Sequence, residues 1–391
     1  MKRSLVAIVS LCGVACSGAG ASPSNDADEG GASQTLPTVT PDGSAKDGGG
    51  SGGDTPDGGD DSGAPPVVTW DPREPGPNEL FTAKDGSSDY LHSVIPDGPK
   101  LDSNSSAIVG GVDSAPRLNG PEWQMTIYMA KNSDPSYHPS LSNADDWGCS
   151  VGDSIHIPDY GTRELPGDGD GWIIVANKED DTVKSIWVAS KSGKSWSGSC
   201  GGSYKLSGNG TAETKLAGVG VGSEVQAGFG FIQYSELQAG AINHALYFTS
   251  TKSCSKFRKP AAKSDGDSSG DSCVPMGARL QLDPEVDCSG LSGASKGEKM
   301  ICKTMQRYGG YVLDSGGSGP ISGIGIAGDD LTDPGRAPWK TPGNGMRGSR
   351  GCSKVGDNCG IVSHAGLDGS SDALSHIPWD KLRVLASWNG K

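Results

Sequence analysis

Residues 240–250 read GAINHALYFTS, and their side chains alternate as in a β-strand. Counting by twos places one set of residues on one face of that strand: Ile242, His244, Leu246 and Phe248. The chain has six histidines, and one of them stands where such a strand normally carries an apolar side chain. The stretch therefore predicts a strand and raises the question of what His244 does there.

The rest of the folded part follows the same pattern of short strands. Clusters of Gly, Ser, Asp and Asn separate runs that are apolar or alternating. These runs are WIIVAN (172–177), VKSIWVASK (183–191), EVQAGFGFIQ (224–233), GARLQLD (277–283), YVLD (311–314) and LRVLASW (382–388). No regular alternation of strands and helices is visible. We therefore predict a mostly β fold, an antiparallel β-sandwich or jelly roll with long loops and one or few short helices.

One helix is predicted in detail. Ser295 with Glu298 three residues later forms a capping box, which marks a helix start. Ile301, Met305 and Tyr308 follow at helical spacing, and Gly309 supplies the stop.

The N-terminus has the plan of a secretory signal. Residues 1–16 contain Lys2 and Arg3, an apolar run and then small residues up to Cys16. Cys16 directly follows Gly-Val-Ala, which resembles a bacterial lipoprotein cleavage site, so that Cys16 would carry lipid. By the same resemblance, Ser17 favours export to the outer membrane. The predicted partner at this end is therefore the outer membrane, reached through a lipid anchor.

A linker separates this end from the folded part. Residues 17–69 contain no aromatic residue and are rich in Gly, Ser, Asp and Pro, which predicts a disordered tether. Nine acidic residues and one lysine give it a net charge of −8. The predicted β-rich domain, residues 70–391, also carries −8 of the total of −14. An acidic domain without a basic stripe argues against nucleic acid as a partner.

The cysteines predict an oxidising compartment. Ten are present, and eight remain once Cys12 and Cys16 are set aside. An even number in an exported chain implies up to four disulfides. Eight cysteines allow 105 connectivities; the simplest joins 254–273, 288–302 and 352–359 and leaves 149–200. The sequence contains no CxxC pair, so neither a zinc site nor a redox motif is indicated.

Two histidines are candidates for chemistry. His244 lies eight residues after Glu236, whose carboxylate could set the imidazole tautomer for a general base. The alternative is a core histidine bonded to the backbone. His156 precedes the acidic GDGDGW segment (167–172), where Asp168 and Asp170 could offer oxygen ligands to a cation or a sugar hydroxyl, or could lie in a solvated turn.

Other polar residues lie on or after predicted strands. Asp314 ends YVLD and is either a catalytic carboxylate or a turn cap. Arg279 could clamp a sugar carboxylate or pair with Asp283. The segment 264–272 starts like a calcium loop, but Met276 stands where the final glutamate is required. We therefore expect no metal, and no motif indicates a cofactor.

Five segments together resemble a broad group of secreted, mostly uncharacterised bacterial proteins. The segments are HIP (156–158), ELQAGAINHAL (236–246), PMGARLQLDP (275–284), MQRYGGYVLDSGG (305–317) and LRVL (382–385). The resemblance covers roughly residues 75–390. It implies a β-rich secreted domain and marks His156, His244, Arg279 and Asp314 as candidate site residues.

The leading hypothesis is a surface-tethered enzyme acting on an extracellular polysaccharide. A glycoside hydrolase needs two carboxylates across a cleft, drawn from Glu236, Asp170 and Asp314. A polysaccharide lyase needs a base, His244 or Tyr308, and a cation such as Arg279.

Aromatic side chains stack on sugar rings, and Trp172, one of nine tryptophans, joins Arg279 and Tyr308 as a substrate-binding candidate. The alternatives are a non-catalytic glycan-binding or adhesive lipoprotein and a purely structural envelope protein. The sequence does not set the oligomeric state.

Overall fold

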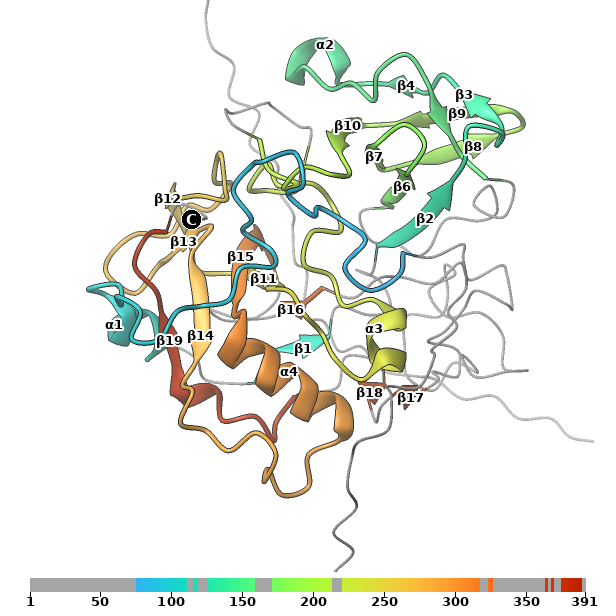
Figure 1. The fold of residues 1–391 in the computed structure, drawn as a ribbon. Coiled ribbons are helices and arrows are strands. Elements are labelled where there is room, and N and C mark those ends of the chain that lie inside the picture. The colour runs from blue at the N-terminus through green and yellow to red at the C-terminus, as the bar shows by residue number, and fades with distance from the viewer. Residues whose placement is uncertain are drawn as a thin grey trace, which may run out of the picture. The chain divides into compact units, whose positions relative to one another are not determined.

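A six-stranded sheet forms the centre of the structure, and the opening stretch supplies one of its inner strands (Figure 1). The strand order is β1-β16-β11-β15-β14-β19. The bounds in that order are Arg117–Leu118, Gly323–Ile324, Leu246–Ser250, Gly310–Ser315, Arg279–Leu282 and Leu382–Val384. All residues of β11 and β14 are buried, including the polar Thr249, Arg279 and Gln281.

The computed structural model describes residues 75–110, 115–118, 125–158, 171–212, 220–316, 323–325, 363–364, 367–368 and 374–388. All of these residues belong to one compact unit, Pro65–Lys391.

A second sheet has four strands in the order β10-β7-β6-β2. Their bounds are Cys200–Lys205, Thr182–Trp187, Ile173–Asn177 and Thr126–Ala130. The smaller sheets comprise β3 (Ser136–Tyr137) with β5 (Ile155–His156), β4 (Ser140–Leu141) with β9 (Ser195–Gly198) and β8 (Ser190–Ser192), β12 (Ser253–Phe257) with β13 (Val274–Met276), and β17 (Ser363–His364) with β18 (Leu367–Asp368).

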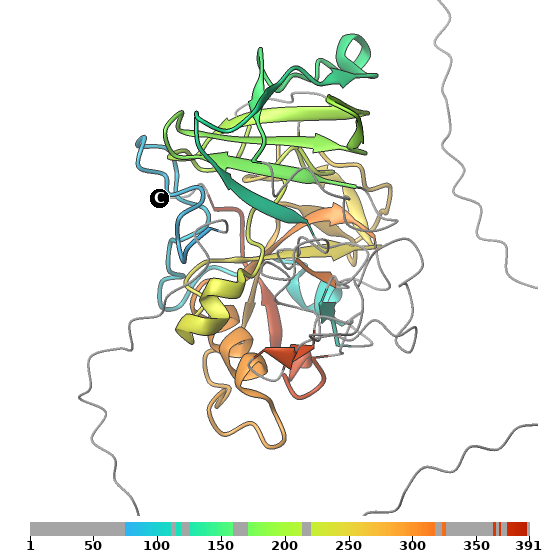
Figure 2. The same ribbon diagram turned by 90° about the vertical axis from the view of Figure 1, so that its right-hand side faces the viewer.

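Strand alternation builds the core in layers, and Figure 2 shows the two larger sheets one above the other. In β11, Phe248 enters one apolar cluster while Tyr247 enters another. The Tyr247 cluster also contains Ile174 of β6, so it joins the two larger sheets. Ile173 of β6 points the other way, into a third cluster with Trp196 of β9. The six-stranded and the four-stranded sheet are therefore each buried on both faces.

Four α-helices occur among the described residues: α1 Ser105–Val109, α2 Ala144–Trp147, α3 Tyr234–Ala239 and α4 Lys296–Arg307. A 3₁₀ turn covers Trp379–Lys381. The predicted capping box is confirmed, because Ser295 accepts from the Glu298 backbone N–H at 3.1 Å and the Glu298 carboxylate accepts from the Ser295 N–H at 2.9 Å. Ile301 and Met305 of α4 pack in the Phe248 cluster.

Two strand predictions are wrong in detail. Residues 240–245 precede β11, so His244 lies before the strand, and the helix α3 (Tyr234–Ala239), which the sequence analysis did not predict, comes before them. Residues 224–233 form no strand, because Glu224, Gly228 and Gly230 have φ of +63°, +85° and +73°. Extended strands require negative φ, and glycine adopts these positive values without steric cost.

The mostly β class is confirmed, and several pairings are antiparallel. The two larger sheets are mixed, however, because β11 pairs in parallel with β15 and β2 pairs in parallel with β6. A sandwich or jelly roll in the strict sense stays a prediction.

Three of the four predicted disulfides are confirmed: Cys149–Cys200, Cys254–Cys273 and Cys288–Cys302. Cys352 and Cys359 lie outside the described residues. Three disulfides are typical of an oxidising compartment outside the cytoplasm. No helix in the described part of the chain has the length and apolar character needed to cross a bilayer.

Candidate functional site

His244 and Glu236 form a buried pair that fixes the loop between them. Glu236 lies in α3, where its carboxylate Oε2 also accepts from the Gln233 N–H at 2.9 Å. His244 Nε2 lies 3.0 Å from both oxygens of Glu236 and hydrogen-bonds Oε2. Its Nδ1 lies 2.9 Å from the carbonyl oxygen of Ala245. The side chains are 6% and 1% exposed, so the pair is part of the interior.

These partners set the protons on the pair. A carbonyl oxygen only accepts, so Nδ1 of His244 carries a proton and donates it to Ala245. A second proton lies between Nε2 and Glu236. Burial opposes a charged imidazole, but the neighbouring Glu236 carboxylate prevails and raises the pKa of His244 above its usual value. His244 is therefore bonded to the backbone, as the core interpretation expects, and its other nitrogen faces a carboxylate. A role as general base stays a prediction.

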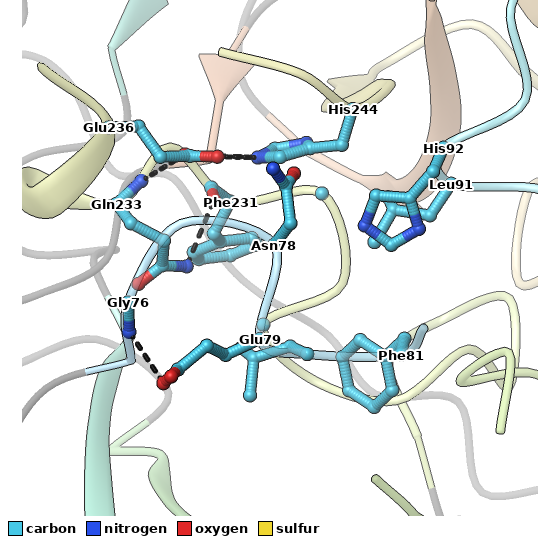
Figure 3. A pocket seen from close by; sticks show the side chains of 13 residues that line it. Gly76, Asn78, Glu79, Phe81, Leu91, His92, Phe231, Gln233, Glu236 and His244 are labelled. Atoms are coloured by element: carbon cyan, nitrogen blue, oxygen red, sulfur yellow. Dashed lines mark hydrogen bonds and ion pairs between the residues drawn. The ribbon is translucent and has the colours of Figure 1, made fainter. Parts of the chain in front are cut away.

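The pair lines a small pocket (Figure 3). An N-terminal segment covers it, and the amide of Asn78 points toward His244. The cavity measures about 20 Å³, which is space for roughly one water molecule. A sugar ring does not fit in this volume, so the pocket is not a glycan cleft in this structure.

The covering segment is strained. Asn78, Phe81 and Ala83 have φ of +58°, +53° and +51°, which non-glycine residues rarely adopt. The Leu91 carbonyl accepts from the Ala245 N–H at 2.8 Å and so ties the segment to the start of β11. Residues held in sparsely populated conformations persist where the surroundings fix them. The segment is therefore a fixed cover of the His244 pocket.

Arg279 and Tyr308 meet in the interior. The Arg279 guanidinium donates to the carbonyl oxygens of Tyr308 and Ser93 at 2.6–2.9 Å. It also lies over the rings of Tyr311 and Trp388, at 5.4 and 4.7 Å. Arg279 is 3% exposed, and burial lowers its pKa. As placed, it binds the protein's own backbone and rings, away from any solvent-facing ligand.

Asp314 lies elsewhere, at the end of β15. It accepts from the Tyr247 hydroxyl at 2.9 Å and from the Gly222 N–H at 3.3 Å. Asp265 approaches the same place, because a Cβ built on Gly222 would lie 2.4 Å from an Asp265 oxygen and 2.6 Å from an Asp314 oxygen. Two carboxylate oxygens therefore lie no more than about 5 Å apart, so Asp265 and Asp314 form a pair of neighbouring carboxylates.

The other residues that the sequence analysis proposed for the site do not contact the groups described so far. His156 pairs with Ser136 in the β3–β5 ladder, and its Nδ1 lies 2.9 Å from the Asp134 carbonyl oxygen. Asp170 and Cys16 lie outside the described residues. The structure thus unites Glu236 with His244, and Arg279 with Tyr308, but leaves Asp314 and His156 apart from both pairs.

Three tryptophans lie together beside the second sheet. Trp172, a predicted sugar-binding residue, is 6% exposed and lies against Trp187 at 6.4 Å between ring centroids. Trp147 of α2 stacks on Trp187 at 6.1 Å with an interplanar angle of 22°. Trp147 is 41% exposed and Trp187 is half-buried. We call Trp147 and Trp187 the tryptophan platform.

Local bonds hold the platform in place. The Cys149–Cys200 disulfide follows Trp147 by two residues and reaches β10, where Cys200 is the register partner of Trp187. Asn143 before α2 donates from Nδ2 to the Ser199 hydroxyl at 2.8 Å. The short helix is therefore fastened to the strand that lies beside Trp187, and both rings are positioned in advance.

A groove runs beside α4. Its volume is about 460 Å³, within the range of ligand sites. Four cations of α4 line it, opposite the loop Gly240–Asn243. They are Lys296, Lys299, Lys303 and Arg307. We call this the α4 groove.

The sequence prediction missed both features. The cations of α4 are spaced by three, four and four residues, so the predicted helix could have revealed them as one face. Trp147 and Trp187 are 40 positions apart, and no local pattern indicates that they stack.

No protein-family model matches this chain, and no curated protein or solved structure is significantly similar to it.

Proposed function

We propose that this chain is an exported, non-catalytic glycan-binding protein that holds sugar rings on the tryptophan platform. Trp147 carries the proposal, because its ring stacks on Trp187 and is 41% exposed, which leaves an aromatic surface open to a ligand. Sugar rings present C–H faces that pack on such surfaces, and indole supplies a large, rigid contact area.

Neighbouring groups complete the platform. Asp145 and Asp146 precede Trp147 in α2, are exposed and have no partner within the described ranges. Carboxylates accept hydrogen bonds from hydroxyls, so they would orient a stacked sugar.

The dispersal of the polar candidates favours binding over catalysis. His244 and Glu236 face a cavity of about 20 Å³, and Arg279 is 3% exposed. Neither arrangement offers a base or a cation to a polymer. The predicted tether and the lipid anchor at Cys16 remain part of the proposal and would present the platform at the cell surface.

The test is affinity electrophoresis of the full-length oxidised chain through gels containing neutral or acidic polysaccharides. We expect retardation by at least one polysaccharide and its loss in Trp147→Ala, because the exposed ring is removed. The matched control is Phe257→Ala, which removes another exposed ring, 50% exposed, from β12. Equal retardation of Trp147→Ala and the parent, or equal losses in both variants, would overturn the proposal.

One observation favours an enzyme as the second candidate. Asp265 and Asp314 bring carboxylate oxygens within about 5 Å, and Tyr247 donates to Asp314. A glycoside hydrolase built on this pair would release reducing ends from a polysaccharide panel, and Asp314→Asn would abolish release in a chain that stays folded. A polysaccharide lyase built on His244 has no such support, because that side chain faces a cavity of about 20 Å³. No turnover by the parent on any glycan that it binds would leave the binding function.

A further inference from the structure

The four cations of the α4 groove share one helix face. Lys296, Lys299, Lys303 and Arg307 follow one another at intervals of three or four residues, which places their side chains in a row. From first to last, the row extends about 16 Å along the helix at 1.5 Å per residue. Lys296, Lys303 and Arg307 are exposed, and Lys299 is half-buried.

Among the residues that the structure describes, the row has no anionic neighbour in the groove. No acidic side chain lines the groove, and within the described ranges none of the four cations has an ion pair. Glu298 of the same helix is engaged by His376 and by the Ser295 cap instead. In a chain of net charge −14, an uncompensated row of four positive charges is a local exception.

The opposite wall is held firmly. Thr304 donates from its hydroxyl to the Ile242 carbonyl at 2.9 Å, which joins the loop 240–243 to α4. The two ends of the loop are joined behind the groove by the Glu236–His244 pair. These contacts hold the loop 240–243 against α4, beside the row of cations.

We propose that the α4 groove binds the carboxylates of an extended acidic polysaccharide, a uronate chain. This inference rests on the proposed glycan-binding function and names a ligand class for it. A uronate chain carries one carboxylate on each sugar, so it matches a linear row of cations. Nucleic acid fits less well, because Tyr308, the only aromatic residue lining the groove among those described, is 6% exposed and offers no face for base stacking.

The experiment is a calorimetric titration of the full-length oxidised chain with oligogalacturonate and with the same oligosaccharide after carboxyl reduction. The groove variant is Lys299→Gln/Lys303→Gln, and the matched control is Lys84→Gln/Lys131→Gln, which removes two exposed lysines elsewhere. We expect the groove variant to weaken oligogalacturonate binding about tenfold, because two partly exposed charge contacts are lost. The control should change it less than about twofold.

Several outcomes would overturn the inference. The first is an equal loss of oligogalacturonate affinity in the groove and control variants, and the second is an equal affinity of the parent for the acidic and the carboxyl-reduced sugar. The inference would also fail if the parent did not bind oligogalacturonate, or if it bound a single-stranded oligonucleotide more tightly. A failure of the proposed glycan-binding function would be seen in a different experiment. In that case, affinity electrophoresis would show that Trp147→Ala binds every polysaccharide as the parent does.

Discussion

At the scale of single residues, His244 shows how a buried ionisable side chain is accommodated. Its two nitrogens have two fixed partners, the Ala245 carbonyl and the Glu236 carboxylate. Removing one member leaves the other buried without its counter-charge, which costs more than the pair contributes. The pair therefore specifies the position of the loop between α3 and β11 more than it adds net stability.

Replacing His244 is expected to destabilise the protein strongly. His244→Gln should lower the free energy of unfolding by about 3–5 kcal/mol, measured by urea denaturation. The control is His376→Gln, which removes a histidine–glutamate contact whose histidine side chain is 44% exposed. Because solvent screens that contact, the control should cost about 0–1 kcal/mol. Similar costs in both variants would contradict this account of the buried pair.

The same pair predicts a pH dependence. The folded-state pKa of His244 is raised above the usual value of 6.5. The native state therefore holds the proton more tightly than the unfolded chain, and the stabilisation is fully present below about pH 6.5. It is lost as the pH rises through the higher folded-state pKa. Urea denaturation of the parent and His244→Gln should show a larger difference in unfolding free energy at pH 6 than at pH 9, and equal differences would contradict it.

At the scale of elements, local signals predicted α4 well and the region before β11 poorly. The Ser295 capping box and the Gly309 stop are local, so the sequence located the helix. The pattern in residues 224–233 was also a local signal and predicted a strand. The positive φ of Gly228 and Gly230 breaks the extended backbone there. Gln233, Glu236 and Gly240 could have predicted α3, since they occupy the cap, third and stop positions of a short helix.

Contacts that are distant in sequence explain what the sequence could not predict. Pairing cysteines with near neighbours in the sequence predicted three disulfides correctly. The packing of the two larger sheets against each other could not be predicted, because it depends on contacts within the Tyr247 cluster. The separation of Asp314 from Glu236 and His244 likewise depends on the order of strands in the sheet. Spacing along the chain does not encode that order.

The Cys149–Cys200 disulfide is predicted to serve the tryptophan platform. Cys149→Ala/Cys200→Ala should lower the free energy of unfolding by about 2–5 kcal/mol and weaken glycan binding about tenfold, because α2 loses a covalent link to β10. Cys254→Ala/Cys273→Ala should lower stability comparably and leave glycan affinity unchanged. Urea denaturation and calorimetry measure the two quantities. Unchanged glycan affinity in the first variant would contradict this role.

At the scale of the whole molecule, two surfaces of different chemistry occur on one acidic chain. The tryptophan platform offers aromatic area beside two carboxylates, and the α4 groove offers four cations. Stacking on indole depends little on salt, whereas charge pairing in the groove is screened. A single chain could therefore hold a polysaccharide through its sugar faces and its carboxylates.

Salt should separate the two surfaces. Raising the ionic strength from about 0.1 M to about 1 M shortens the Debye length from roughly 10 Å to 3 Å. Calorimetric titrations should show that oligogalacturonate binding weakens across this range, while binding of the carboxyl-reduced sugar stays nearly constant. Parallel losses for both ligands would show that one electrostatic surface serves both.

The central claim is that the tryptophan platform holds sugar rings. Its most direct test is an NMR titration that follows the indole N–H signals of the nine tryptophans while a glycan that the protein binds is added. Single Trp→Phe variants assign each signal. The account predicts that the Trp147 signal shifts most, that Trp187 follows, and that the buried Trp196 and Trp379 stay unchanged. A carboxyl-reduced glycan that binds without moving the Trp147 signal would contradict the claim that this platform is the surface that holds sugar rings.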